Sequence, residues 1–311
     1  MNLNIGKRAI GPGQPAFIVA EMSGNHNRDY NKALKLIDAA ARAGADAVKL
    51  QTYTADTMTL NLKTDYFRIR ADNPWKGRTL YELYQSAATP WEWQPKLKKY
   101  AEERGLVLFS TPFDETAVDF LEKMDVRLYK VASYEITDIP LLRKIGKLGK
   151  PVILSRGLAS EQEVAEAVAA LRQSGTSEIA VLQCADAYPA PAAEMNLATI
   201  PDIAKRFGVV AGLSDHTLGV NVAVAAVALG ASIIEKHLTL SRASGGPDAS
   251  FSLEPAELAE LVKAAREVER AVGQVSYKLG REESENLVFR RSLFVVADIK
   301  KGEEFTAQNV R

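Results

Sequence analysis

Eight short apolar segments, rich in β-branched residues, alternate with helical stretches along the chain. The first is FIVAEM at residues 17–22. The others lie at 47–52, 106–112, 128–133, 151–157, 179–184, 209–215 and 232–239. Strands that are apolar along their whole length are typical of parallel sheets covered by helices. Because eight strand–helix units are the number that closes a barrel, we expect an α/β protein with a (β/α)8 TIM barrel.

The segments between the strands support this prediction. Residues 30–44 carry apolar side chains at helical spacing and end on Gly44, a common helix stop. Ser160 followed by Glu163 forms a capping box, so a helix should begin after Ser160. The competing fold is a doubly wound open sheet, which a GxGxxG motif after the first strand would favour. EMSGNHN stands there instead.

The repeating pattern ends near Gly273. We expect the barrel domain to cover residues 1–275, with its last helix at 254–273. Residues 276–311 should hold a polar linker and the beginning of a second small module, with one strand at SLFVVADI, residues 292–299.

Composition narrows the class of protein. Lys and Arg together number 39 and so do Asp and Glu, so the chain lacks the basic field that nucleic acid or a membrane surface requires. No segment approaches the ~18 apolar residues of a membrane span. Cys184 is the single cysteine and lies in an apolar strand with no histidine beside it, so we expect a buried thiol and a cytoplasmic protein without disulfides.

One connection is much longer than the others. It follows the second strand and carries Tyr66, Phe67, Trp75 and Tyr81 before a helix restarts near Thr89. Long excursions of this kind are usually functional or disordered, and the aromatic residues favour an ordered lid or a wall of the substrate site. Trp91 and Trp93, at the start of the next helix, are expected to be packing anchors.

Polar side chains stand at the end of every predicted strand. In a β/α barrel the carboxyl ends of the strands carry the chemistry, and buried charges are costly unless paired. Several cations and hydroxyls at one mouth predict an anion site for phosphate or carboxylate. The candidates are Glu21, Asn25, His26, Lys49, Gln51, Ser110, Thr111, Lys130, Ser133, Glu135, Ser155, Arg156, Asp186, Tyr188, Ser214, Asp215, His216, Glu235, Lys236 and His237.

The chain contains three histidines, and two of them are one β/α unit apart. His216 and His237 should therefore lie on neighbouring strand ends, as imidazole ligands do in metal sites that keep open positions for substrate. His26 lies several residues beyond its strand. A third metal ligand, a substrate contact and a turn-stabilising role all remain open for it.

The motifs point to a known family. In this order over roughly residues 15–275 the chain carries AEMSGNHN, KLQTYTADTMTL, STPFDETAVDFLE, KVASYEITD, CADAYPAP, GLSDHTLG and IEKHLTL…GGPDASFSLEP. Together they resemble the sialic acid (nonulosonate) synthase family, and the first two are similar to its pseudaminate branch. The resemblance implies a TIM barrel that condenses phosphoenolpyruvate with an open-chain amino sugar and releases phosphate by C–O cleavage. In the pseudaminate branch the sugar is 2,4-diacetamido-2,4,6-trideoxy-L-altrose; the N-acetylneuraminate and legionaminate branches are alternatives.

The resemblance also implies roles for single residues. A divalent metal, Mn²⁺ with Mg²⁺ or Co²⁺ as alternatives, is held by His216 and His237 and polarises the aldehyde oxygen. Glu21 lies near the reacting carbons, where it orients water or moves a proton. The phosphoenolpyruvate positions are Lys49, Thr111, Lys130, Ser133, Ser155 and Ser214. The sugar positions are Gln51, Glu135, Tyr188 and Asp248.

Three features depart from the family pattern. Arg156 stands where relatives have threonine, and Asp186 stands where some have asparagine or serine, so it would repel an anion unless protonated or turned away. Relatives also carry a C-terminal antifreeze-like (SAF) module whose arginine reaches the partner subunit's sugar site. This sequence stops at Arg311, so we expect only a truncated start of that module. The family forms domain-swapped dimers, which implies a homodimer.

Two other classes of function remain. A non-catalytic barrel that acts as a sugar-binding scaffold would account for Arg156, Asp186 and the shortened module. Another metal-dependent barrel enzyme, such as an aldolase, would use pyruvate and release no phosphate.

Overall fold

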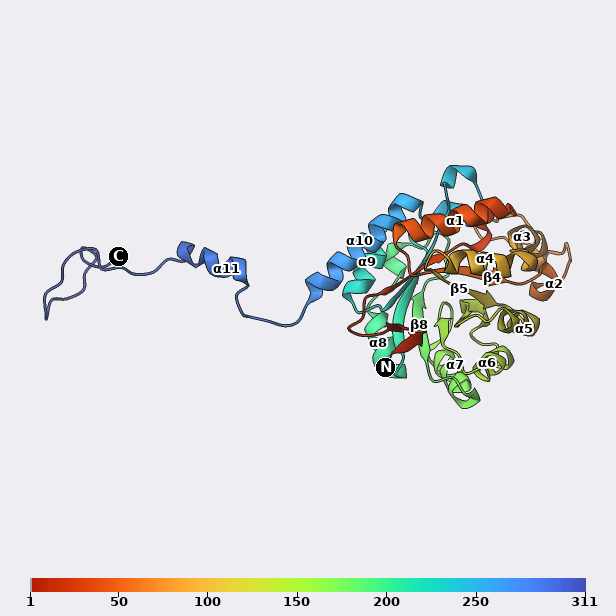
Figure 1. Ribbon diagram of the computed structural model, residues 1–311, viewed down its shortest axis with the longest axis horizontal. Helices are drawn as coiled ribbons and strands as arrows, with labels where there is room; N and C mark the ends of the chain where they lie inside the picture. Colours follow the sequence, from red (N-terminus) through yellow and green to blue (C-terminus); the bar gives the residue numbers. More distant parts are fainter. Residues whose placement is uncertain (1) are drawn as a thin grey trace. The chain divides into compact units, whose positions relative to one another are not determined.

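The computed structural model describes residues 2–311, which divide into a unit ending at Val272 and a second unit, Gly273–Arg311. The first unit is a closed barrel of parallel strands in the order β10-β3-β4-β5-β6-β7-β8-β9 (Figure 1). The strands are β3 Phe17–Glu21, β4 Ala47–Thr52, β5 Val107–Pro112, β6 Tyr129–Val131, β7 Val152–Ser155, β8 Ile179–Cys184, β9 Val210–Asp215 and β10 Ile233–His237. Because β10 pairs with β3, the barrel is closed, and the predicted TIM barrel is confirmed over the open sheet.

Helices cover the outside of the barrel and connect its strands (Figure 1). They include α1 Tyr30–Ala43, α4 Gln94–Glu102, α5 Glu115–Lys123, α6 Ile139–Gly146, α7 Glu161–Ser174, α8 Thr199–Phe207, α9 Asn221–Ala228 and α10 Pro255–Val272. Helix α1 ends at Gly44, whose φ of 82° suits glycine, and α7 begins with the reciprocal bonds of the Ser160–Glu163 capping box. Both predicted helix boundaries are confirmed.

The amino-terminal end of the barrel is closed by apolar packing. Side chains alternate between the lumen and the helix layer along each strand, and the lower lumen is filled by a cluster that includes Phe109. A short antiparallel hairpin, β1 Leu3–Ile5 and β2 Arg8–Ile10, contributes Leu3, Ile5 and Ile10 to the same cluster. This hairpin could not be predicted from the sequence, because strands of three residues are too short to show an alternating pattern. The carboxyl end is therefore the mouth open to a ligand.

The long connection after β4 is ordered. It contains α2 Ala55–Met58, a 3-10 turn at Asp65–Phe67 and α3 Leu80–Ala87. Trp75 Nε1 donates a hydrogen bond of 2.7 Å to the carbonyl oxygen of Pro247, which ties this segment to the loop after β10. Trp75 lines the cavity described below, whereas Tyr66 is 93% exposed and does not. That this segment is a wall of the substrate site stays a prediction.

Both tryptophans before α4 are packing anchors, as predicted. The Trp91 ring lies 4.7 Å from that of Phe120 between centroids. Trp93 meets Tyr30 and His26 edge-on at 5.4 and 5.8 Å. These contacts fix the start of α4 against neighbouring elements.

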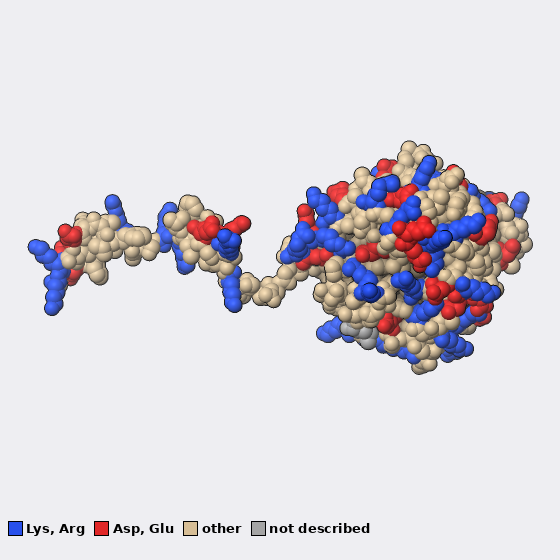
Figure 2. All heavy atoms as spheres, viewed as in Figure 1, with Lys and Arg blue, Asp and Glu red and all other residues tan. Residues whose placement is uncertain are grey.

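On the face of the barrel seen in Figure 2, Lys and Arg side chains are interspersed with Asp and Glu. Among the described residues, no helix combines the length and hydropathy needed to cross a bilayer.

The second unit, Gly273–Arg311, contains α11 Arg281–Glu285, a 3-10 turn at Asn286–Phe289 and an isolated bridge between Val295 and Val310. The strand predicted at residues 292–299 is wrong. Phe294 and Val295 are about two-thirds exposed (66% and 64%), so the apolar run has no opposing layer within this unit to bury it. That this unit begins an antifreeze-like module stays a prediction.

Candidate active site

Alternation along the strands decides which polar side chains reach the lumen. Ser110, Asp215 and Lys236 occupy the alternate positions of their strands, whose side chains face the helix layer and not the lumen. Ser110 Oγ lies 2.6 Å from Thr52 Oγ1, and Lys236 Nζ lies 2.8 Å from Asp215 Oδ2, so these three candidates form polar contacts outside the lumen. Other polar residues alternate in step with the apolar residues that fill the lower lumen, so their side chains point into the lumen. They are Glu21, Lys49, Gln51, Thr111, Lys130, Ser155, Cys184, Ser214, Glu235 and His237.

A cavity of about 420 Å³ opens at the carboxyl ends of the strands. Of the predicted site residues, Glu21 and Thr111 are fully buried and do not line it. The Thr111 hydroxyl has no hydrogen-bond partner. The predicted residues that line the cavity are Lys49, Gln51, Lys130, Ser133, Glu135, Ser155, Tyr188, Ser214, His216, His237 and Asp248.

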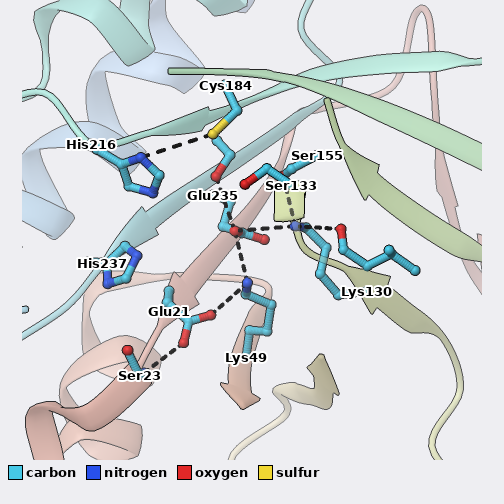
Figure 3. Close-up of polar contacts among 12 residues, drawn as sticks. Glu21, Ser23, Lys49, Lys130, Ser133, Ser155, Cys184, His216, Glu235 and His237 are labelled. Atoms are coloured by element: carbon cyan, nitrogen blue, oxygen red, sulfur yellow. Dashed lines mark hydrogen bonds and ion pairs between the residues drawn. The ribbon is translucent and has the colours of Figure 1, made fainter. Parts of the chain in front are cut away.

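Lys49, Lys130 and Glu235 form the charged floor of this cavity, and Glu21 is fully buried beside Lys49 (Figure 3). Glu235 Oε1 lies 2.9 Å from Lys49 Nζ and 3.8 Å from Lys130 Nζ, and Glu21 Oε2 lies 2.8 Å from Lys49 Nζ. Lys130 Nζ also donates a hydrogen bond of 2.7 Å to Ser155 Oγ. All four ionisable groups are almost completely buried, so the two lysines are stabilised by the carboxyl groups beside them in place of water.

The two glutamates differ in their affinity for a proton. Burial raises the pKa of Glu21 above its ordinary value, although Lys49 opposes the change. Burial acts on Glu235 too, but Lys130 and Lys49 together hold its pKa below the ordinary value. Burial also lowers the pKa of Lys130 to about 8. A carboxyl that keeps its proton beside one that stays ionised is an arrangement suited to proton transfer near neutral pH.

The two histidines of the strand ends lie side by side at the mouth, with ring centroids 5.3 Å apart (Figure 3). His216 Nδ1 lies 3.0 Å from the carbonyl oxygen of Ala185. Because a carbonyl only accepts, Nδ1 carries the proton and Nε2 keeps a free lone pair. Burial lowers the pKa of His216 and of His237. Both rings are therefore neutral near pH 7, the form that binds a metal ion.

The residues at the mouth do not form a closed metal site. Within residues 2–311, no three His, Cys, Asp or Glu side chains converge as a preformed site. His237 Nδ1 is buried without a hydrogen-bond partner, and Asp248 Oδ2 lies 3.7 Å from it. A hydrogen bond from the other ring nitrogen to a backbone carbonyl, as His216 makes, is typical of metal-ligating histidines. The pair fits an open site whose other ligands come from water or substrate.

His26 and Arg156 lie outside the cavity lining. His26 Nε2 is 2.9 Å from Thr89 Oγ1, and its Nδ1 accepts from the backbone N–H of Arg28, so the structure supports the turn-stabilising role. Arg156 Nε donates to Gln183 Oε1 at 2.7 Å, away from Ser155. Its charge is therefore not added to the cavity.

Asp186 is turned toward a predicted phosphate-binding serine. Its Oδ1 accepts a hydrogen bond of 2.8 Å from Ser133 Oγ. The contact depends on Gly157, where an added Cβ would lie 2.2 Å from Ser133 Cβ and 2.1 Å from Asp186 Oδ2. We infer that Asp186 orients the serine and does not itself line the cavity.

Cys184 has a histidine neighbour that the sequence analysis did not predict. Its Sγ lies 4.0 Å from His216 Nδ1, across two adjacent strands. Burial nevertheless raises the pKa of the thiol to about 12, so it stays protonated. The thiol is therefore buried, as predicted. Its burial and high pKa keep it unreactive, and not the absence of a neighbouring histidine.

Two parts of the site were not assigned from sequence. Glu235 was only one of many strand-end candidates, although its place two residues before His237 puts it on the same face of β10. On the aromatic side of the mouth, Tyr188 and Trp75 were singled out from the sequence and Phe251 was not. The Tyr188 ring lies 4.5 Å from His216, 5.3 Å from Trp75 and 5.3 Å from Phe251.

The fold and site together define a β/α-barrel enzyme with a cationic floor and a histidine pair at its mouth. The NeuB family model matches residues 36–277. The chain is 42% identical to a pseudaminic acid synthase of Campylobacter jejuni over 295 residues, covering 95% of this chain and 86% of the relative. It is 38% identical to an N,N'-diacetyllegionaminic acid synthase of the same species over 298 residues, covering 94% and 89%.

A solved structure shows the same architecture. The N-acetylneuraminic acid synthetase of Leptospira borgpetersenii superposes with a TM-score of 0.83 at 32% identity, covering 93% of this chain and 96% of that one. The chain belongs to the NeuB family.

Proposed function

We propose that this protein condenses phosphoenolpyruvate with 2,4-diacetamido-2,4,6-trideoxy-L-altrose to give pseudaminic acid and inorganic phosphate. The observation that carries the proposal is the floor of Lys49 and Lys130 beside the histidine pair, in a chain 42% identical to a pseudaminic acid synthase. The floor suits a small dianion, and the histidine side suits a carbonyl group.

The reaction balances without an added redox partner. C3 of phosphoenolpyruvate forms a bond to the aldehyde carbon, and the aldehyde oxygen takes a proton to become a hydroxyl. Water adds at C2, and the C2–O bond to phosphate then breaks. The products are a nine-carbon 2-keto acid and phosphate.

The lysines and hydroxyls hold the phosphoenolpyruvate in this proposal. Lys49 and Lys130 are already paired with Glu235 and therefore stay charged in a buried place. Ser155 and Ser214 flank them, each within hydrogen-bond distance of the network. Fixed donors of this kind bind phosphate and carboxylate without reorganisation. Thr111 and Ser133 complete the proposed set.

Glu21 is the proposed proton carrier. Its Oε1 accepts a hydrogen bond of 2.7 Å from the backbone N–H of Ser23, which fixes the carboxyl against the floor. Because burial raises its pKa, it holds a proton that it can exchange with water or with the new hydroxyl. Gln51, Glu135, Tyr188 and Asp248 are the proposed sugar contacts.

His216 and His237 are the proposed metal ligands, with Mn²⁺ as the preferred ion and Mg²⁺ or Co²⁺ as alternatives. When bound, a divalent ion would supply Lewis-acid polarisation of the aldehyde and acidify water. We also propose that the protein works in the cytoplasm as a homodimer, and that residues 276–311 begin an antifreeze-like module.

Phosphate release tests the proposal. The protein should release phosphate when given phosphoenolpyruvate, Mn²⁺ and the diacetamido altrose, and a Glu21→Gln variant should release it more slowly. Preference for N-acetylmannosamine would move the protein to the neuraminate branch. Phosphoenolpyruvate and Mn²⁺ binding without release from any sugar would favour the scaffold reading, and consumption of pyruvate would favour an aldolase.

A further inference from the structure

A buried ion pair lies behind the two histidines of the mouth, on the side of the strands that faces away from the cavity. Lys236 Nζ is 2.8 Å from Asp215 Oδ2, and both side chains are fully buried. The two residues are partners in the register of β9 and β10. Asp215 stands directly before His216 in the sequence, and Lys236 directly before His237. The pair therefore joins the two backbones from which the imidazoles project.

The ion pair also holds the backbone on the other side of His216. Asp215 Oδ1 accepts a hydrogen bond of 2.8 Å from the backbone N–H of Thr217. Lys236 Nζ donates a hydrogen bond to the carbonyl oxygen of the same Thr217. The residues before and after His216 are thus bound to one ion pair, which leaves His216 little freedom to turn about its own backbone.

The orientation of the His216 ring depends on this backbone. Its Nδ1 lies 3.0 Å from the carbonyl oxygen of Ala185, on a neighbouring segment of the chain. A small rotation of the backbone at His216 would move Nδ1 away from that oxygen. Because a hydrogen bond weakens steeply as its distance and angle depart from the ideal, the tautomer that leaves Nε2 free would then no longer be favoured.

An ion pair is a costly way to hold two strands together. Taking both charges out of water is unfavourable, and well-packed apolar side chains in such places often stabilise a protein equally well. Backbone pairing already joins β9 to β10 at this level of the barrel. Stability alone is thus a weak reason for a charged pair at Asp215 and Lys236, whereas a fixed geometry at the adjoining histidines is a specific one.

We infer that Asp215 and Lys236 are positioning residues that set the backbone and the ring orientation of His216 relative to His237. Neither residue lines the cavity, so they act through the two histidines and not on a substrate. The inference rests on the proposed function only for the metal ion that the two rings would hold.

Two double variants separate positioning from stability. Asp215→Leu with Lys236→Met removes both charges, so that neither is left buried and unpaired. The matched control is Thr52→Val with Ser110→Ala, which removes another polar contact between neighbouring strands, the 2.6 Å contact of the two hydroxyls. Each double variant should lower the urea midpoint. If the first does not fold, Asp215→Asn takes its place, because it keeps an acceptor for the Thr217 N–H.

The first measurement needs no metal. The chain has three histidines, so ¹⁵N-histidine NMR follows each ring separately and distinguishes its two neutral tautomers. His216 should be a single Nδ1–H tautomer in the wild type and in the control, and a mixture in the Asp215→Leu/Lys236→Met variant. His26 is the internal reference, because its Nδ1 accepts from the backbone N–H of Arg28 and its tautomer should not change. An unchanged His216 spectrum in that variant would overturn the inference.

The second measurement is Mn²⁺ affinity by electron paramagnetic resonance. The Asp215→Leu/Lys236→Met variant should bind Mn²⁺ at least about tenfold more weakly than the wild type, and the control should bind it equally well. An equal loss in both double variants would show a purely structural role and would also overturn the inference. A wild type that binds no Mn²⁺ would refute the proposed metal ligands, and the histidine spectra would then decide the positioning role on their own.

Discussion

Glu135 should make the folded protein less stable as the pH rises, and Glu135→Gln should remove that effect. The residue lies in a 3-10 turn after β6, and its Oε2 is buried without a hydrogen-bond partner. Burial raises its pKa from 4.5 to about 7, although Lys130 opposes the change. A carboxylate is therefore held at neutral pH in a place that disfavours its charge.

The pH window follows from these values. Below pH 4.5 the group is protonated in both the folded and the unfolded chain and has no effect on stability. Between pH 4.5 and 7 it ionises first in the unfolded chain, so the free energy of unfolding falls as pH rises. The full difference corresponds to roughly 3 kcal/mol. Partial exposure of the side chain reduces the expected loss to about 2 kcal/mol.

Urea unfolding at pH 5, 6 and 8 measures this effect. Tryptophan fluorescence follows the barrel, because Trp75, Trp91 and Trp93 all lie in it. Glu135→Gln should gain about 2 kcal/mol over the wild type at pH 8 and almost nothing at pH 5. Glu103→Gln, at an exposed position after α4, is the matched control. A gain that is the same at every pH would refute the reasoning.

Three further predictions concern the floor and the mouth. Lys130→Met should raise the KM for phosphoenolpyruvate at least about tenfold with little change in the sugar KM, and equal changes in both would contradict its assignment. Gly157→Ala should displace Ser133 and Asp186, because its Cβ would lie 2.2 Å from Ser133 Cβ. It should raise the KM for phosphoenolpyruvate and lower stability by roughly 2 kcal/mol, and a neutral variant would count against that contact. His216→Gln should abolish Mn²⁺ binding measured by electron paramagnetic resonance, whereas unchanged binding would exclude this ligand.

The barrel could be predicted from sequence because its strands are buried on both faces. Residues 47–52 and 179–184 coincide with β4 and β8, since the apolar runs end where the chain leaves the sheet. The same reasoning predicted a strand at residues 292–299, and that prediction is wrong. An apolar run predicts a strand only where a second layer buries it, and none does so within Gly273–Arg311.

The site could be predicted in part. Strand ends and the spacing of His216 and His237 were sufficient to place the charged floor and the histidine pair at one mouth. The candidates were taken from every strand end without asking which side chains point into the lumen. They therefore included Ser110 and Lys236, which face the helix layer. The tie between the connection after β4 and the loop after β10 could not be predicted, because it depends on a tertiary contact, the hydrogen bond from Trp75 to Pro247.

Phosphoenolpyruvate labelled with ¹⁸O in the bridging oxygen tests the central claim most directly. Incubation with Mn²⁺ and the diacetamido altrose should give a nine-carbon acid by mass spectrometry and place the label in the released phosphate. Label retained in the organic product, or phosphate formed without a new carbon–carbon bond, would contradict the account.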